Sequence, residues 1–486
     1  MENQQPGLGG CQCRIHRFRY RKVFPDGTVA WDTTAVRRNG DIHALRLEGS
    51  LFGSLDGGRW QAKAYYYDSD KGIPGAIVNN VWKNSQRQWD RNFFAQGSFQ
   101  KQFTDRYEFM ANAKYARDYM RYLNPDTTLM YLDNKFWQDE IYVSTANKVE
   151  LLPGWDADFS ADWQWNHLES TLVNFARPTR HTLLTALATA VRLGGFKAQG
   201  SILGTYVFDS AVTGQQGEER RRRHTHFTRF TPALFLSWQP FSERRFNLRA
   251  FYKRIFRMPT FNDLYYTDIG NADLKPEYAT QYNVGASYGI NPATTVWNNV
   301  EASVDFYHNR ITDKIIAVPK GTGQYRWMMM NIGKVRIWGL DVATSAEMQL
   351  PGDVTLNARL SYTWQRALDY SDPTDNKDAA GSYRGQIAYI PRHSGSVTAG
   401  GQWRWLHLNY SFIYVGERWH NSSNIPANYE QPWYTHDVSL SYSGTFGRTR
   451  LRATLEVNNL LNQQYEVIMN YPMPGRNYKL ILQFDI

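Results

Sequence analysis

Apolar and polar residues alternate along most of this chain, and this alternation limits its possible folds more than any other feature. The last eleven residues, RNYKLILQFDI, place Tyr478, Leu480, Leu482, Phe484 and Ile486 on one set of positions, and mostly polar residues on the other. A period of two puts the two sets on opposite faces of a β-strand. No helical period persists, so we predict an all-β chain. The same pattern recurs at 107–115, 301–306, 357–365, 406–414, 434–443 and 451–458.

Two architectures could bury one face of so many strands. A soluble sandwich packs its apolar faces together, whereas a transmembrane antiparallel β-barrel turns them to lipid around a polar lumen. Charged residues in mid-strand and aromatic residues near strand ends favour the barrel. So does the alternation of tight turns with long polar connections such as 369–386 and 419–433. The spacing predicts about 18–20 membrane strands of roughly 10 residues each. A soluble carbohydrate-binding β-protein, also rich in aromatic residues, is the alternative.

Composition excludes several other classes. No run approaches the roughly 18 apolar residues of a membrane-spanning helix. The net charge of +10 comes from 55 Lys and Arg against 45 Asp and Glu, spread along the chain without a nucleic-acid-binding motif. A mixed solvated surface or anionic partners such as lipid phosphates are therefore expected, and nucleic acid is not. Cys11 and Cys13, the only cysteines, cannot form a disulfide framework.

Enzymatic signatures are missing from the sequence. Neither a Gly-x-Ser-x-Gly nor a His-Glu-x-x-His motif is present, and no phosphate-binding Gly-Lys-Ser/Thr occurs. His393 and Ser394 are adjacent, but neighbouring residues of a strand point to opposite faces and cannot act as a catalytic pair. We therefore expect no enzyme, no catalytic residue and no cofactor.

The C-terminal segment resembles the TonB-dependent outer-membrane receptors. LEVNNLLNQQYEV, followed by MPGRNYKLILQFDI, is similar to that family's closing signature: a penultimate strand, an Asn-Leu-x-Asn-x-x-Tyr turn, a Pro-Gly-Arg and a final strand. The family usually ends on an aromatic residue, and here Phe484 stands third from the end. The matching turn positions are Asn459, Leu460, Asn462, Tyr465, Pro474, Gly475 and Arg476.

Two further segments extend the resemblance to roughly residues 20–486. AYYYDSDKGIPG (64–75) is similar to the vitamin B12 receptor branch of the family. The stretch 256–285 is similar to the family's Arg-x-Pro-(Thr/Ser)-x-x-(Asp/Glu)-(Leu/Met)-(Tyr/Phe) motif followed by Gly-Asn-x-x-Leu-x-Pro-Glu. Its matching residues are Arg257, Pro259, Thr260, Asp263, Leu264, Tyr265, Gly270, Asn271, Leu274, Pro276 and Glu277.

The resemblance implies a receptor in the cell outer membrane, surrounded by lipid. Such receptors are monomeric barrels of 22 strands with a plug in the lumen. Their external loops capture a scarce ligand such as cobalamin, an iron–siderophore or haem, and the TonB energy-transducing complex pulls on the plug. We expect the plug and the first barrel strands to be missing here. Residues 1–13 are then a disordered non-family extension and 14–486 the barrel portion. A plugless passive porin and an inactive receptor fragment are the alternatives.

Ligand contacts are predicted in the long loops that would face outward. Tyr325, Trp327, Trp419 and Trp433 could grip a large flat ligand, although the same residues suit an interfacial aromatic belt. Asp369, Asp372, Asp375 and Asp378 could hold calcium with carboxylate oxygens. A solvated acidic loop is the competing interpretation, and no other metal ligands are expected.

Overall fold

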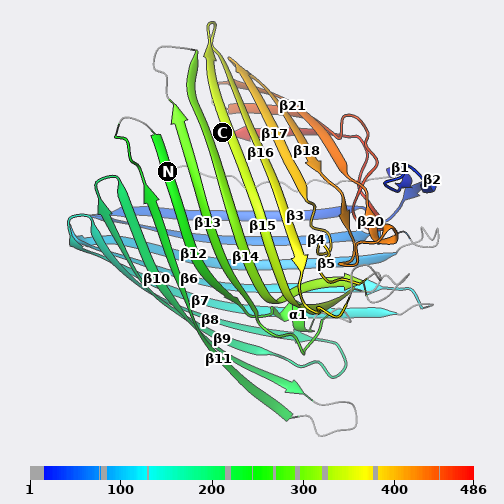
Figure 1. Ribbon diagram of the computed structural model, residues 1–486, viewed down its shortest axis with the longest axis horizontal. Coiled ribbons are helices and arrows are strands. Elements are labelled where there is room, and N and C mark those ends of the chain that lie inside the picture. The colour runs from blue at the N-terminus through cyan, green and yellow to red at the C-terminus, as the bar shows by residue number, and fades with distance from the viewer. Residues whose placement is uncertain are drawn as a thin grey trace.

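Antiparallel hairpins follow one another along the chain, and in the computed structural model they close into a barrel (Figure 1). In the described residues 19 strands form this barrel, which confirms the predicted all-β membrane architecture. The predicted extension at 1–13 lies outside the described residues. The structure describes residues 16–75, 77, 85–127, 131–213, 221–242, 245–265, 270–290, 296–319, 327–375, 381–447 and 449–485.

The barrel strands are β3 (Ile42–Leu55), β4 (Gly58–Ile73), β5 (Gln86–Thr104), β6 (Tyr107–Asn124), β7 (Leu132–Leu152), β8 (Trp155–Ser170), β9 (Thr179–Leu193), β10 (Phe196–Thr213), β11 (Arg221–Trp238), β12 (Arg245–Arg257), β13 (Glu277–Ile290), β14 (Trp297–Pro319), β15 (Trp327–Leu350), β16 (Val354–Asp369), β17 (His393–Trp403), β18 (Leu406–Val415), β21 (Trp433–Phe446), β22 (Thr449–Asn458) and β25 (Asn477–Asp485). The shorter elements are β1 (His16–Val23), β2 (Val29–Arg37), α1 (Phe261–Tyr265), β19 (Arg418–Trp419), η2 (Pro426–Asn428), β20 (Tyr429–Glu430), β23 (Glu466–Ile468) and β24 (Tyr471–Pro472). Among the described residues, no helix has the length and apolar character needed to cross a membrane.

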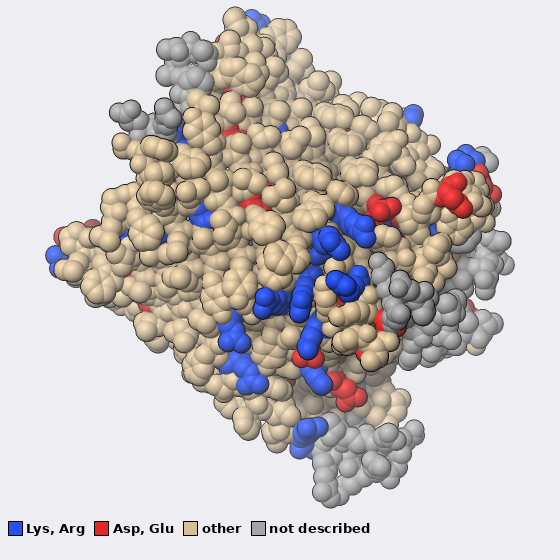
Figure 2. All heavy atoms as spheres, in the orientation of Figure 1, with Lys and Arg blue, Asp and Glu red and all other residues tan. Residues whose placement is uncertain are grey.

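The pairing register keeps apolar side chains on one face of the wall. Val284 lies opposite Phe306, Phe306 opposite Leu340, and Leu340 opposite Trp364. Val284 is 64% exposed and Phe306 46%, so this face is apolar and unburied by the protein. Over β13–β16 the surface in Figure 2 is largely tan, apart from a blue band near one end of these strands. An outward face of this kind fits lipid.

The opposite face of the same strands carries ion pairs, as a water-filled lumen permits. Lys114 pairs with Glu140 at 2.9 Å, and both residues lie between outward-facing neighbours in β6 and β7. These pairs confirm the predicted polar inner face. Others on this face are Lys63–Glu48, Lys71–Asp90, Arg192–Asp156, Arg249–Asp305 and Lys479–Glu456.

The final strand closes the barrel, as its alternation predicts. β25 pairs antiparallel with β22 and lies beside β3. Because the number of strands is odd, β3 and β25 run in the same direction. Tyr478 and Leu480 are 69% and 67% exposed on the lipid side. Ile486 lies outside the described residues.

The two ends of the barrel differ. Two residues join β3 to β4, β7 to β8, β9 to β10 and β17 to β18, and this is the short-turn end. The long connections 258–276, 370–392, 416–432 and 459–476 lie at the opposite, loop end, together with the β1–β2 hairpin. Buried apolar residues gather there in small clusters, such as Ile311, Ile332, Val335, Ala367 and Ile387. Four of these five residues lie in β14–β16, and Ile387 of connection 370–392 packs against them.

Candidate functional site: the loop end of the barrel

Hydrogen bonds join the connections at the loop end to one another. The Gln386 backbone N–H donates to Asn424 Oδ1 at 2.6 Å, and Asn424 Nδ2 donates back to the Gln386 carbonyl at 3.0 Å. The Tyr389 N–H donates to the Trp419 carbonyl at 2.7 Å. Gln386 is wholly buried. Connections 370–392 and 416–432 therefore form one unit, which we call the loop cap.

The β1–β2 hairpin also belongs to the loop cap, although it lies at the other end of the sequence. The Arg19 N–H donates to Gln464 Oε1 at 2.9 Å, and the Val23 N–H to Gln431 Oε1 at 3.2 Å. Gln431 Nε2 donates to the Arg21 carbonyl at 3.1 Å. The hairpin thus bridges 416–432 and 459–476, and both connections are included in the cap.

Buried charges hold these segments together. Lys22 of β1 and Glu430 of β20 are 6% and 5% exposed, and Lys22 Nζ lies 3.5 Å from Glu430 Oε1. His420 Nδ1 lies 3.2 Å from the same oxygen. Arg418, 3% exposed, donates to the backbone carbonyls of Glu466 at 2.5 Å and Val467 at 3.3 Å. Charges removed from water need such partners. The cluster of Lys22, Arg418 and Glu430, with the adjoining His420 and Glu466, is called the buried ion cluster.

Burial in the ion cluster shifts the pKa values of Glu466 and Arg418. Burial, and secondarily the Glu430 carboxylate, raises the pKa of Glu466 to about 8, while the Asn470 N–H, donating to Glu466 Oε2 at 2.6 Å, opposes the shift. Burial also lowers the pKa of the Arg418 guanidinium. The Glu466 carboxyl therefore holds its proton near neutral pH.

We expect the loop cap to loosen as the pH rises. The pKa of Glu466 lies above the ordinary value of 4.5, so its contribution to stability is complete below about pH 4.5 and is lost as the pH approaches 8. Hydrogen exchange over 459–472 measures this effect, once the rates are corrected for the intrinsic pH dependence of exchange. Protection of these amides should fall by at least about tenfold between pH 5 and pH 9, the equivalent of one pKa unit. Glu466→Gln should abolish this fall, and Glu417→Gln in the neighbouring connection should retain it. Equal pH dependence in Glu466→Gln would contradict the assignment.

Of the four predicted ligand-contacting aromatics, Trp419 lies in the loop cap, and Trp433, the first residue of β21, packs against it. The Trp433 ring stacks on Tyr465 with centroids 4.6 Å apart. The Trp419 ring meets Tyr429 edge-on at 6.5 Å and lies 5.5 Å below the Arg392 guanidinium. Tyr325 lies outside the described residues, and only the backbone of Trp327, the first residue of β15, is described. Ligand contact by all four stays a prediction.

The three predicted calcium ligands that the structure describes accept local hydrogen bonds. Asp369 Oδ1 accepts from Ser371, Asp372 Oδ1 from Thr374, and Asp375 Oδ2 from Ser382, each through a backbone N–H at 2.9 Å and a hydroxyl. These bonds hold the pKa of Asp372 and Asp375 below the ordinary value. Asp378 lies outside the described residues, within which no group of three His, Cys, Asp or Glu is arranged for a metal. The three described carboxylates stabilise turns.

The C-terminal motif builds the last turn of the loop cap. Asn459 and Asn462 both have left-handed backbones, with φ of 50° and 53°. Asn459 Nδ2 donates to the Gln463 carbonyl at 2.8 Å, and the Arg476 N–H donates to Asn462 Oδ1 at 2.9 Å. A Cβ at Gly475 would come within 2.5 Å of that same oxygen, so a larger residue would have to displace the Asn462 amide. The Leu460 N–H binds the His436 carbonyl, and Tyr465 packs on Trp433. These contacts hold the turn between β22 and β25, and a structural role for these residues stays a prediction.

The central motif folds a second loop against the inner wall. Arg257 Nη2 donates to Asp263 Oδ2 at 3.0 Å, and the Thr260 N–H donates to the same carboxylate oxygen at 2.9 Å. Glu277 Oε2 accepts the Ile315 N–H at 3.0 Å and lies 3.5 Å from Arg257. A Cβ at Gly270 would lie 2.7 Å from the Tyr265 nitrogen.

Two more motif residues complete this loop. Asn271 Nδ2 donates to the Met329 carbonyl at 3.0 Å, and Pro259 is fully buried ahead of α1. Pro276 precedes β13, where its fixed φ suits the entry into the strand. These contacts of the described motif residues shape the connection between β12 and β13.

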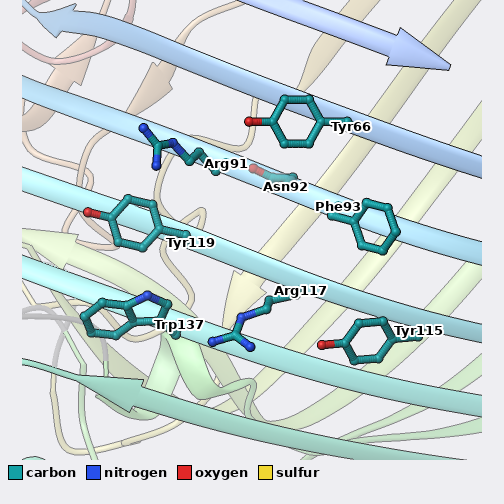
Figure 3. A pocket seen from close by; sticks show the side chains of 8 residues that line it. All are labelled: Tyr66, Arg91, Asn92, Phe93, Tyr115, Arg117, Tyr119 and Trp137. Atoms are coloured by element: carbon teal, nitrogen blue, oxygen red, sulfur yellow. The ribbon is translucent and has the colours of Figure 1, made fainter.

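A hollow on the wall between β4 and β7 faces away from the lumen. Figure 3 shows its side chains on the near side of these strands, with the opposite wall behind them. Arg91 and Arg117 stand among aromatic rings there, and Arg91 Nε lies 2.8 Å from Asp68. In a membrane this hollow faces lipid, so it is not the site of ligand capture.

Sequence reasoning missed the buried ion cluster. Its members stand in polar loop segments, where charged residues are usually solvated, and Lys22 and Glu430 are 408 positions apart. Glu466 within YEVIMNY is the one charged residue in an otherwise apolar or neutral run, and this is the only signal of burial in the sequence.

The chain matches a known protein family over most of its length. Residues 14–460 match the family model described as TonB dependent receptor-like, beta-barrel. The Vitamin B12 transporter BtuB of Photobacterium profundum is 23% identical over 352 residues, which cover 71% of this chain and 50% of that protein. The chain thus spans about half the length of this curated relative.

Solved structures share the fold at low sequence identity. The FrpB iron transporter from Neisseria meningitidis (F3-3 variant) superposes with a TM-score of 0.69 and 12% identity, over 96% of this chain and 74% of that chain. The ferric-catecholate import receptor Fiu from K12 E. coli, in a closed form, gives a TM-score of 0.68 and 13% identity, over 99% and 81%. At these identities the likeness concerns the fold alone.

Proposed function

Since this chain belongs to the TonB-dependent receptor β-barrel family, whose members are non-enzymatic outer-membrane proteins, we propose that it captures a scarce small-molecule nutrient for import. The match of the family model over residues 14–460 carries this proposal. Cobalamin is the first candidate, because the curated relative is named a vitamin B12 transporter. An iron–siderophore or haem is the second candidate. The TonB complex is the proposed energy source, and outer-membrane lipid surrounds the wall.

We place ligand capture at the loop cap. The cap joins three long connections and the β1–β2 hairpin into one unit, so its aromatic side chains are held on a rigid base. Trp419 belongs to this unit, and Trp433 of β21 stacks on its Tyr465. A corrin or porphyrin macrocycle is flat and largely apolar, and aromatic rings bind such surfaces by offset stacking. We also propose that calcium held by Asp369, Asp372, Asp375 and Asp378 would stiffen the same region.

Binding to the purified chain tests the proposal. We expect saturable quenching of tryptophan fluorescence by cyanocobalamin, by a ferric siderophore or by haem. Trp419→Ala and Trp433→Ala should each weaken binding about tenfold, the equivalent of about 1.4 kcal/mol for a buried aromatic contact. Trp405→Ala, at the short-turn end, is the matched control and should leave the affinity unchanged. If both loop variants kept the affinity, capture would not depend on these rings.

A passive pore is the second candidate, and the charge-lined inner face of the barrel favours it. Conductance in planar bilayers separates the two functions. A steady ion current that none of the three ligands reduces would support the pore. Saturable ligand binding that blocks the current would support the receptor.

A further inference from the structure

A row of arginines crosses the outward face of the barrel close to the loop end. Arg254 lies opposite Thr280, Thr280 opposite Arg310, and Arg310 opposite Arg336, while Arg366 lies opposite Trp338 on the next strand. All four arginines are exposed. They lie on the same face of the strands as the lipid-facing residues Val284, Phe306 and Leu340. Figure 2 shows Lys and Arg gathered in a band across this face, where β12–β16 approach α1. We call Arg254, Arg310, Arg336 and Arg366 the arginine belt.

A row of aromatic rings lies directly beneath the arginine belt, two residues further along each strand toward the short-turn end. Tyr252 and Tyr282 have centroids 5.4 Å apart, Tyr282 and His308 6.3 Å, and His308 and Trp338 3.8 Å. Tyrosine and tryptophan rings mark the level at which hydrocarbon gives way to head groups. The apolar residues Val284, Phe306 and Leu340 follow below. The arginine belt therefore stands at the height of the lipid head groups.

The charge of the arginine belt is uncompensated within the described chain. None of its four guanidinium groups forms an ion pair with a described carboxylate. Arg310 Nε donates to His308 Nε2 at 3.1 Å, and the Arg336 guanidinium lies 4.5 Å from the Tyr370 ring centroid. Like charges directly opposite each other on paired strands, as in Arg310 and Arg336, destabilise a sheet. Such an arrangement fits an anion supplied from outside the protein.

Two other outward arginines near the same end show the contrast. Arg91 of β5 lies 2.8 Å from Asp68, and Arg117 of β6 lies 3.8 Å from Asp139. Both are exposed and stand among aromatic rings (Figure 3). Each has a carboxylate of the protein as its counterion. The arginine belt lacks this neutralisation.

We propose that the arginine belt binds the phosphate groups of lipids in the outer leaflet. Guanidinium groups match phosphate oxygens with paired, charge-assisted hydrogen bonds. The aromatic row and the apolar wall beneath it offer the lipid's acyl chains a surface directly below its head group. A free phosphate or an acidic protein would leave that apolar surface unused. This inference goes beyond nutrient capture, because it assigns a binding surface on the outside of the barrel.

Lipid binding to the intact chain in neutral detergent tests the proposal. The probe is lipid A, a phosphorylated glycolipid, with bound lipid counted by native mass spectrometry. One arginine near a charged membrane contributes about 1 kcal/mol, or about fivefold in affinity. Arg310→Gln combined with Arg336→Gln should therefore weaken binding about 25-fold. Arg91→Gln combined with Arg117→Gln is the matched control and should weaken it less than about fivefold, because those charges are already neutralised.

Three further arms make the proposal refutable. Dephosphorylated lipid A should bind the native chain no better than it binds the Arg310/Arg336 variant. If the native chain bound lipid A and dephosphorylated lipid A equally well, the assignment of phosphate as the ligand would be overturned. Displacement of lipid A by equimolar inorganic phosphate would show a simple anion site and overturn the lipid assignment. An equal loss in the Arg91/Arg117 control would also overturn it. Heat-modifiable gel migration checks folding, and Arg254→Gln combined with Arg366→Gln provides a second belt variant with the same expected loss.

Discussion

Leu480→Arg is expected to destabilise the barrel by about 2–4 kcal/mol, the range for an arginine on the lipid face near the bilayer midplane. Leu480 lies in the middle of β25, opposite Leu455, and is 67% exposed on the outward face. In lipid its replacement would place a guanidinium group in hydrocarbon. Urea titration of the chain refolded into bilayers, followed by tryptophan fluorescence, measures the loss in free energy of unfolding.

Ile481→Arg is the matched control for this result. Ile481 is the next residue of the same strand and lies opposite Thr454 on the inner face. Its arginine would reach the water of the lumen, so we expect a change of less than about 1 kcal/mol, typical of a solvated substitution. Equal losses in the two variants would contradict the assignment of the two faces.

Sequence pattern was sufficient to predict the wall of the barrel. Lipid on one side and water on the other impose a period of two on every strand, and this signal is local. The face assigned to Tyr478 and Leu480, and the polar face that carries Lys479, followed from it directly. The position of the β1–β2 hairpin could not be predicted from the alternation. Its contacts with Gln431 and Gln464 join residues more than 400 positions apart. No local pattern encodes such a contact.

The candidate site was predictable only in part. Long loops rich in aromatic residues pointed to the end of the barrel where Trp419 lies in the loop cap and Trp433 packs against it. The charges that hold this cap were not predictable, because Arg418 and Glu430 stand in polar segments that resemble solvated loops. Their burial results from tertiary packing of three connections and a hairpin. The left-handed backbones of Asn459 and Asn462 and the close approach at Gly475 likewise appear only in the backbone geometry.

Arg180→Ala should have an effect as large as that of Leu480→Arg. Arg180 of β9 donates to both carboxylate oxygens of Asp209 at 2.7 Å and to the Pro259 carbonyl at 2.7 Å. Its guanidinium also lies 5.2 Å from the Phe261 ring centroid, and the residue is 8% exposed. Removing it leaves a largely buried carboxylate and a carbonyl unpaired, so we expect a loss of about 3–5 kcal/mol. The same urea titration measures it, and limited proteolysis should cleave 258–276 faster.

Replacing both charges separates an unpaired carboxylate from lost packing. A buried ion pair exchanged for apolar residues of similar volume is often close to neutral, because neither partner is left unpaired. Arg180→Met combined with Asp209→Leu should therefore recover most of the stability lost in Arg180→Ala, to within about 1 kcal/mol of the native chain. Resistance of 258–276 to limited proteolysis should recover only in part, because the double variant still lacks the hydrogen bond to the Pro259 carbonyl. If the double variant were as unstable as Arg180→Ala, the stabilisation would come from the guanidinium, which packs against Phe261 and binds the Pro259 carbonyl. The unpaired carboxylate of Asp209 would then contribute little to the loss.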